Sequence, residues 1–587
     1  MFSNNWTKLD PGILLSGIFL AAAWLVPNHY LPWVAAWGDA LAIFGLLLLL
    51  PSVMASAASG ARVSWQLSGV AVISGIMLLA QITTGKLLFG GDALMAAFYV
   101  GLWLAAVLTG RLLAAADSRS SGFNTLTASW LIAALLSIGV ALVQWTGAFS
   151  LGIYAADLPP GGRPFANVAQ PNHLCTLCFL GLCSLLWQHQ RQRVNGAVFW
   201  MSAGFLLLGM IITQSRTGWL QIVLLIAWGI FMRVRADLRI TRVQLLMLGA
   251  VFVVGTLLWP LINDAMLLPA AGRSMSDNMR AGNRLPNWWG MLDAIGREPL
   301  WGFGWQQVGA AQQRVALEHP AMTEFLEHSH NLVLDLLLWN GIPAGSVIIG
   351  ALAWWFIAQI HACRDARIVW LLGAVGGVFT HGMLEFPLEY AYFLIPVGLM
   401  MGAIEGFLSL GAPSLCVKRW AVLSFTGLLT AVFLWTAVEY LKVEENYRTL
   451  RMESARIGVE GIVTPAPRLR LLTQLEAFLQ FTRTEATPNM RPDQVDWMRK
   501  VSERFGYPSV LFRYALAAGL NGQPQVAHEA LARLCRVHGS KRCIEAHEAW
   551  AVLQARYSQL AGISNEVQIS LNHESVLRSA LTPYLLP

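Results

Sequence analysis

The first 440 residues consist mainly of long apolar runs separated by short polar segments. A helix rises about 1.5 Å per residue, so about 20 apolar residues cross the hydrocarbon core of a bilayer. Thirteen runs approach or exceed this length, and they lie at 12–27, 31–51, 67–84, 92–109, 128–147, 172–188, 197–213, 217–232, 243–262, 330–360, 368–385, 390–408 and 420–438. Because an open sheet leaves backbone groups unpaired in lipid, all thirteen are predicted to be transmembrane helices.

The rest of the chain, 441–587, differs from this body in its charge. It holds 32 of the 73 Lys, Arg, Asp and Glu residues in about a quarter of the length. The sequence therefore predicts an all-α protein with two domains. Residues 1–440 form a transmembrane catalytic domain that includes a long loop at 263–329, and residues 441–587 form a water-soluble α-helical domain. This composition excludes a soluble enzyme, a disordered protein and a small disulfide scaffold.

The distribution of basic residues predicts the orientation of the spans. If the N-terminus is cytoplasmic, fourteen basic residues fall in inner loops and three, Lys86, Arg163 and Arg216, fall in short outer loops. The excess of basic residues on the cytoplasmic side favours this orientation. It also accounts for the net charge of +7 without a nucleic-acid partner. An odd number of spans then places 441–587 outside, which indicates a bacterial inner membrane with this domain in the periplasm.

Small and apolar residues recur at helical spacing in 508–539, around the break at Asn521-Gly522-Gln523-Pro524. This pattern predicts a helical hairpin that resembles one tetratricopeptide unit. Cys535 and Cys543 flank the segment VHGSKR. In an oxidising periplasm they are expected to form a disulfide, and the alternative is two buried thiols.

Five polar clusters lie in segments that this topology places outside, where polar groups near lipid must face a cavity or a partner. The first runs from Arg163 to His173. Gln170 and Arg163 are candidates for contact with a polar ligand at the membrane surface. Asn172 and His173 follow a helix-starting proline, and for these two residues a capping role is the expectation.

The second and third clusters supply arginines. Arg216 joins two spans with almost no loop, and its guanidinium fork suits a pyrophosphate; the alternative is snorkelling to lipid headgroups. The long loop is made basic by Arg273, Arg280, Arg284 and Arg297. Arg284, beside Trp288 and Trp289, is the candidate for ligand binding, and the alternative is a solvated charge.

The fourth and fifth clusters supply a base and acidic or aromatic groups. His330, in His328-Ser-His330-Asn331, begins a span and can accept a proton near neutral pH. The alternatives are a helix cap and a metal site, although no third metal ligand accompanies the two histidines. Glu385 and Tyr390, between later spans, are candidates for binding sugar hydroxyls or orienting the histidine.

Taken in order, several segments resemble the bacterial O-antigen ligase and O-antigen polymerase superfamily. They are GRPFANVAQPNH, SRTG, R-x-x-x-W-W, P-L-x-G-x-G, HSHN and HGMLEFPLEY. The chain is most similar to its protein O-oligosaccharyltransferase branch, the PglL type, because it has an extended N-terminal segment and a soluble helical tail. The resemblance implies a GT-C-like helical fold.

The resemblance also implies an activity and residue roles. An oligosaccharide would pass en bloc from undecaprenyl pyrophosphate to Ser or Thr hydroxyls of a periplasmic or pilus protein, without metal or other cofactor. His330 would be catalytic, and Arg216 with Arg284 would bind pyrophosphate. Gln170 and Tyr390 match positions associated with transfer, and a supporting role is expected for Arg163, Asn331 and Glu385.

Other activities remain open at this point. An O-antigen ligase would use the same donor and a lipid A core acceptor, whereas an O-antigen polymerase would extend another lipid-linked glycan. A transporter of lipid-linked glycans would need ionisable residues at mid-membrane and internal repeats. Asp39 and Asp335 are the two acids expected near the middle of a span, and no repeated half accompanies them.

The predicted topology can be tested with reporters. A reporter that is active only in the periplasm, fused after Pro587, should be active because thirteen spans bring the C-terminal domain outside. A reporter that functions only in the cytoplasm should be silent at the same position. Activity of the cytoplasmic reporter would contradict the orientation of every loop.

Overall fold

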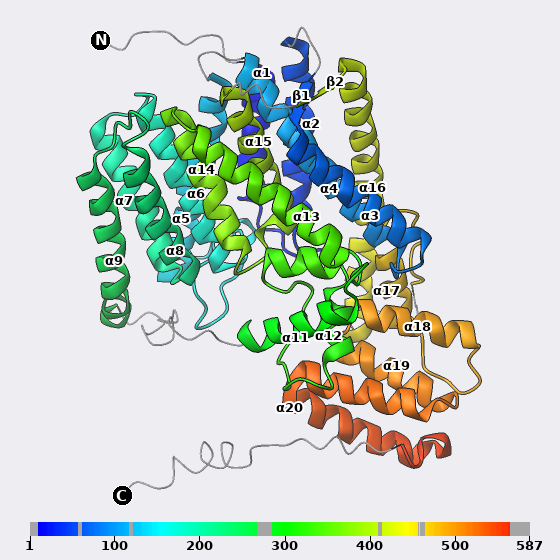
Figure 1. Cartoon of the computed structure of the whole chain (residues 1–587). Coiled ribbons are helices and arrows are strands. Elements are labelled where there is room, and N and C mark those ends of the chain that lie inside the picture. Colours follow the sequence, from blue (N-terminus) through cyan, green and yellow to red (C-terminus); the bar gives the residue numbers. More distant parts are fainter. Residues whose placement is uncertain are drawn as a thin grey trace, which may run out of the picture. The chain divides into compact units, whose positions relative to one another are not determined.

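The computed structural model describes residues 10–56, 61–116, 121–266, 284–408, 414–455, 457 and 464–563. Helices dominate these residues (Figure 1). Two short strands, β1 (Ala61–Ser64) and β2 (Ser414–Val417), pair antiparallel with Ala61 opposite Val417. The predicted all-α, polytopic fold class is therefore confirmed, with this small ladder as an addition.

Each of the thirteen apolar runs forms a helix. These are α1 (Pro11–Ala22), α2 (Ala36–Ser56), α3 (Trp65–Thr83), α4 (Gly90–Ala116), α5 (Ser121–Thr146), α6 (Pro171–Gln190), α7 (Gly196–Ile212), α8 (Arg216–Met232), α9 (Arg242–Ala265), α13 (Leu332–Ala362), α14 (Ala366–Gly382), α15 (Ala391–Leu408) and α16 (Arg419–Ala455). Among the described residues, eight helices are long and apolar enough to cross a membrane. The protein is a multi-pass membrane protein, and the number thirteen stays a prediction.

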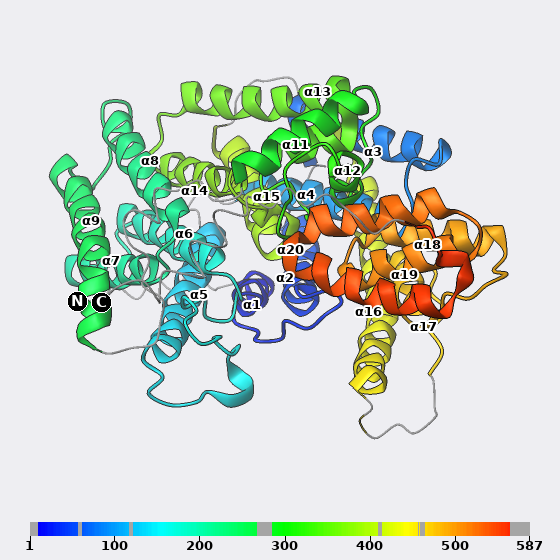
Figure 2. The same cartoon turned by 90° about the horizontal axis from the view of Figure 1, so that it is seen from below.

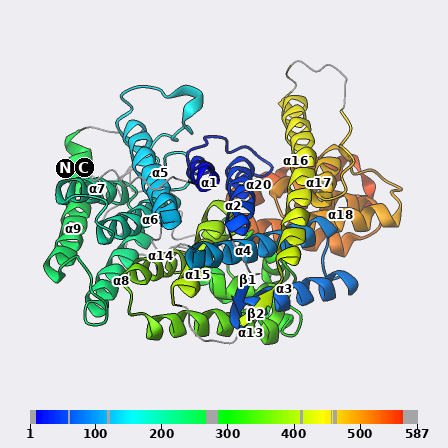
Figure 3. The ribbon, with the colours of Figure 1, turned by 90° about the horizontal axis from the view of Figure 1, so that it is seen from above.

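Helices α4 and α15 cross at very short range because α15 carries a glycine at every fourth position. A Cβ atom on Gly402 would lie 1.9 Å from the carbonyl oxygen of Val107, and one on Gly398 or Gly406 would also meet α4. Small residues at this spacing let helix backbones approach closely in membranes. Figure 3 shows the two helices side by side. The crossing fixes α15, which follows the loop with Glu385.

The sequence predicted one uninterrupted helix over the run 330–360. The structure differs, because α13 is interrupted at Gly341 (φ 72°, ψ 175°). The segment 299–304 packs against the break and provides hydrogen bonds there. Phe303 donates its N–H to the carbonyl of Leu338 at 2.7 Å, and Ile342 donates to that of Pro299 at 2.7 Å. A broken helix is tolerated inside a membrane protein when neighbouring groups pair its freed backbone.

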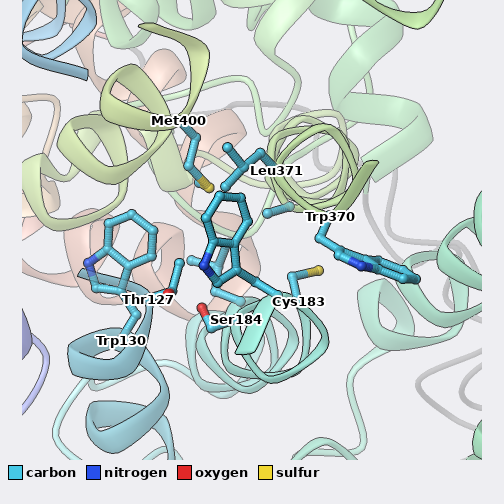
Figure 4. Close-up of a pocket in the computed structure, with 10 residues that line it drawn as sticks. Thr127, Trp130, Cys183, Ser184, Trp370, Leu371 and Met400 are labelled. Atoms are coloured by element: carbon cyan, nitrogen blue, oxygen red, sulfur yellow. The ribbon is translucent and has the colours of Figure 1, made fainter. Parts of the chain in front are cut away.

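A small cavity lies inside the membrane body, among α5, α6, α14 and α15 (Figure 4). It is lined mainly by apolar and aromatic side chains, including Trp130, Trp187, Trp370 and Met400. Its space suffices for about one water molecule. A sugar or a lipid headgroup does not fit there, so the cavity is not a substrate site.

The structure divides into two compact units. The first comprises Met1–Arg284, Glu298–Trp305 and His328–Glu476, and the second comprises Leu285–Arg297, Gln306–Glu327 and Ala477–Pro587. Helix α16 runs through residue 440 without interruption, so compactness does not separate the chain there. The predicted boundary at 440/441 was drawn where the apolar sequence ends, whereas the two units are defined by compactness. The boundary therefore stays a prediction.

The second unit includes part of the long loop. Its elements include α11 (Arg284–Arg297, from Leu285), α12 (Val308–Val315), α17 (Thr473–Arg483, from Ala477), α18 (Pro492–Arg504), α19 (Pro508–Leu520) and α20 (Pro524–Arg556). Gln313 donates its side-chain amide to the carbonyl of Ser502 at 3.1 Å, and Met322 donates its N–H to that of Arg536 at 2.7 Å. Residues 306–327 are therefore a folded part of the second unit.

The predicted helical hairpin corresponds to α19 and α20, which lie side by side (Figure 2). Helix α19 ends at Leu520 and α20 begins at Pro524, so the break falls where the sequence placed it. Helix α20 is itself interrupted at Gly539 (φ 75°). A disulfide joins Cys535 and Cys543 across this second bend.

The break in α13 predicts an unequal response to two Gly→Ala substitutions in one helix. Gly341→Ala should lower the free energy of unfolding by about 2 kcal/mol or more, because its dihedral angles are almost restricted to glycine. The added Cβ would also lie 2.5 Å from the carbonyl oxygen of Leu300. Gly350→Ala is the matched control, since no atom lies within 4 Å of its Cβ position. Equal thermal unfolding midpoints in detergent would contradict this account.

Candidate active site

Glu385 lies in the loop between α14 and α15, and its carboxylate collects donors from three other parts of the chain. Oε2 accepts a hydrogen bond from Nδ1 of His330 at 2.7 Å. Oε1 accepts from Nδ2 of Asn172 at 2.9 Å and from a guanidinium nitrogen of Arg284. The residue is 5% exposed. Segments more than 200 residues apart in the sequence therefore meet at one buried charge.

The loop conformation before α13 points His330 at this carboxylate. His330 has φ +57°, and Asn331 is the N-cap of α13. The Asn331 side chain accepts hydrogen bonds from the backbone N–H groups of Val333 and Leu334 at 3.0 and 3.2 Å. The alternative interpretation of His330 as the helix cap is therefore wrong, because its neighbour occupies that position.

The charge on Glu385 determines which nitrogen of His330 can act as a base. Burial alone would raise the pKa of Glu385, but the hydrogen bond from His330 and the nearby guanidinium of Arg284 lower it to about 2. An ionised carboxylate only accepts hydrogen bonds, so Nδ1 of His330 carries the hydrogen. Nε2 is then the acceptor nitrogen of the neutral ring, as a general base requires.

Asn172 connects this carboxylate to the arginine loop. The hydroxyl of Ser215 donates to Oδ1 of Asn172 at 2.8 Å. The next residue, Arg216, begins α8, and three residues separate it from the end of α7. The capping role expected for Asn172 is wrong, because Gln170 is the N-cap of α6 and the Asn172 side chain joins Ser215 to Glu385. Arg216 is half-buried at a helix N-terminus, a position that favours an anion.

Arg163 also supports this short loop. One guanidinium nitrogen donates to the carbonyl oxygens of Thr213 and Gln214 at 3.0 and 3.2 Å. These carbonyls belong to the connection between α7 and α8. Arg163 therefore helps to hold the segment from which Arg216 projects.

A buried polar layer next to Glu385 was not predicted. Nδ1 of His381 and the hydroxyl of Thr176 share a hydrogen bond of 2.8 Å. The side-chain amide of Gln221 donates to the same hydroxyl at 2.9 Å. His173 is 1% exposed and packs edge-on against Tyr390, with ring centroids 4.7 Å apart, so it does not cap α6. Polar residues inside apolar runs, such as Thr176 and Gln221, were the signal for this layer.

The remaining candidate residues lie in different parts of the chain. Oε1 of Gln170 is buried, and no described residue pairs with it, which suits a ligand at the start of α6. Arg297 belongs to the second unit and pairs with Asp293 and Glu318. Arg273 and Arg280 lie outside the described residues.

Within the described residues, one group of three side chains has the spacing of metal ligands. Cys535, Cys543 and His547 place one ligand atom each within 4.8 Å of one another. The two sulfurs are joined in a disulfide, so neither is a thiolate that could bind a metal. This group lies in the second unit, whereas His330 and Glu385 belong to the first.

Two family models match separate parts of the chain. A family model described as O-Antigen ligase matches residues 197–349, which include Arg216, Arg284 and His330. A second, described as virulence factor membrane-bound polymerase, C-terminal, matches residues 369–557, which include Glu385. These two segments are similar to the O-antigen ligase superfamily.

The chain is also similar to proteins named for oligosaccharide transfer. It is 28% identical over 540 residues to the General O-oligosaccharyltransferase of Acinetobacter baylyi, covering 90% of this chain and 92% of that protein. It is 26% identical over 412 residues to the ComP-specific O-oligosaccharyltransferase of the same organism, covering 69% and 73%. The similarity to the first extends through both units.

The site predicts the effect of replacing His330 by asparagine. Asparagine tolerates a positive φ and can still donate a hydrogen bond to Glu385, but it offers no basic nitrogen. His330→Asn should therefore insert normally and lower acceptor glycosylation at least about 100-fold at matched protein levels.

His328→Ala is the comparison for this variant. His328 stacks on Phe386 with ring centroids 4.6 Å apart, whereas His330 donates the hydrogen bond to Glu385. It should keep most of the activity. Near-normal glycosylation by His330→Asn would remove the base assignment.

Proposed function

We propose that the protein is an oligosaccharyltransferase that moves an oligosaccharide en bloc from undecaprenyl pyrophosphate to Ser or Thr hydroxyls of periplasmic or pilus proteins. The similarity to the General O-oligosaccharyltransferase, which extends over nine-tenths of this chain, supports the transferase class and a protein acceptor. The family model for O-antigen ligase, over residues 197–349, supports a donor of the lipid-linked kind.

The observation that carries the proposal is the hydrogen bond between His330 and the ionised Glu385. In the proposed step, Nε2 of His330 takes the proton of the acceptor hydroxyl while its oxygen attacks the anomeric carbon. The bond from that carbon to the pyrophosphate oxygen breaks, and undecaprenyl pyrophosphate leaves with the electron pair. Glu385 stabilises the imidazolium that forms, as a carboxylate behind a general base does.

Arg216 and Arg284 are proposed to bind the pyrophosphate. The leaving group develops negative charge as the bond breaks, and guanidinium groups stabilise such charge with paired hydrogen bonds. The predicted outer loops contain no Asp-x-Asp or Glu-x-Asp pair of the kind that holds a metal–diphosphate complex. The reaction is therefore proposed to proceed without a metal ion.

The proposed orientation places this site on the periplasmic face. Finished lipid-linked glycans lie on that face, and nucleotide sugars stay in the cytoplasm. A periplasmic site would therefore meet its donor and a secreted acceptor in the same compartment.

A second candidate function is O-antigen ligation, in which the acceptor is lipid A core. The description of the first family model favours it, and the second favours polymerisation of a lipid-linked glycan. All three reactions share the donor and the chemistry at His330, so they differ only in the acceptor.

The test is transfer by purified protein from a lipid-linked oligosaccharide to three acceptors offered separately: a pilin, lipid A core and a second lipid-linked glycan. We expect glycosylated pilin at a Ser or Thr, in the presence of EDTA, because the arginines replace a metal ion. His330→Asn is the inactive control. Product on lipid A core alone would support the ligase, and activity that EDTA abolishes and Mg²⁺ restores would contradict the arginine-based donor site.

A further inference from the structure

In the described part of the chain, the guanidinium of Arg284 forms an ion pair with Glu385, and the neutral ring of His330 donates a hydrogen bond to it. The proposed function assigns the same guanidinium to the pyrophosphate of the donor. We propose that Arg284 exchanges partners during the reaction, leaving Glu385 for the donor pyrophosphate. Glu385 is then a positioning residue, and its negative charge acts on His330 without being offset by Arg284 once the donor is bound. This inference rests on the proposed function of the site.

The contacts of Glu385 allow this exchange without loss of its position. Arg284 and Asn172 both donate to Oε1, whereas His330 donates to Oε2. If the guanidinium leaves, the Asn172 amide still holds Oε1 and the hydroxyl of Ser215 still holds Asn172 at 2.8 Å. The carboxylate therefore keeps its place against His330.

The exchange changes the charge that His330 experiences. A guanidinium offsets the negative charge of a carboxylate, but an uncharged amide does not. With Arg284 on the pyrophosphate, the full charge of Glu385 acts on the imidazole ring across a 2.7 Å hydrogen bond. A nearby negative charge stabilises the protonated ring, so the histidine becomes a stronger base when the donor is present.

The same exchange means that Glu385 opposes donor binding. The pair that must separate is enclosed, with side-chain exposures of 22% for Arg284 and 6% for Glu385. A diphosphate carries more negative charge than one carboxylate, so it can compete for the guanidinium. Removal of the carboxylate charge should therefore tighten donor binding and at the same time slow the chemical step.

The decisive variant is Glu385→Gln, which keeps the size of the side chain and removes its charge. We expect it to bind a fluorescent lipid-linked pyrophosphate donor at least about fivefold more tightly than wild type, because no ion pair has to open. Its kcat at saturating donor and acceptor should fall about 100-fold. A residue that merely supports the fold would weaken donor binding or leave it unchanged.

Glu405→Gln is the matched control. Glu405 is also enclosed and pairs with one guanidinium, at 2.6 Å from Arg111, and it accepts a hydrogen bond from Trp355 at 2.9 Å. This pair belongs to the helical body and shares no residue with the site. Glu405→Gln should bind the donor as wild type does, even if its unfolding midpoint is lower.

Two arginine variants separate failure of this inference from failure of the proposed function. Arg216→Ala and Arg284→Ala should each weaken donor binding. If both variants bind the donor like wild type, the pyrophosphate assignment is wrong, and the proposed exchange of partners is wrong as well. If both weaken binding but Glu385→Gln does not tighten it, the exchange alone is overturned. If the Glu385→Gln protein does not accumulate, Glu385→Ala replaces it in this test. It should also tighten donor binding, because no ion pair with Arg284 has to open.

Discussion

A carboxylate that is almost fully enclosed by protein must be neutralised by its neighbours, and Glu385 meets this constraint with donors from distant parts of the chain. The side chains of Asn172, Arg284 and His330 have to converge for the charge to be tolerated. The first turn of α6, the start of α11 and the loop before α13 are thereby positioned together. The constraint that stabilises the local fold thus also builds the site.

The sequence identified all five clusters that contribute to this site, because costly polar groups stand out against apolar runs. It assigned some of their members wrongly. Asn172 follows a proline at a helix start, where a short polar side chain usually caps, and its two real partners lie 43 and 213 residues away. Local spacing contains no information about contacts of that length, so the pattern favoured the cap.

The same limit explains what was missed in the fold. The thirteen apolar runs were sufficient to find thirteen helices, since each helix is a local consequence of its own composition. The interruption of α13 was not visible, because the apolar pattern continues across Gly341 and the cause is the backbone of residues 299–304. Likewise, the loop pattern of 306–327 did not reveal that its partners are Ser502 and Arg536.

The interruption at Gly341 also affects how the protein tolerates different membranes. The segment of α13 before the break is nine residues long, from Leu332 to Asn340, and therefore spans about 13 Å. Its C-terminal end is held by Gln81, whose amide donates to the carbonyls of Trp339 and Trp301 at 2.6 and 3.1 Å. The depth of His330 is thus set by contacts within the protein and not by matching a full-length helix to the hydrocarbon thickness. The His330 ring should keep its height when lipid chain length changes, while the longer segment after the break adjusts its tilt.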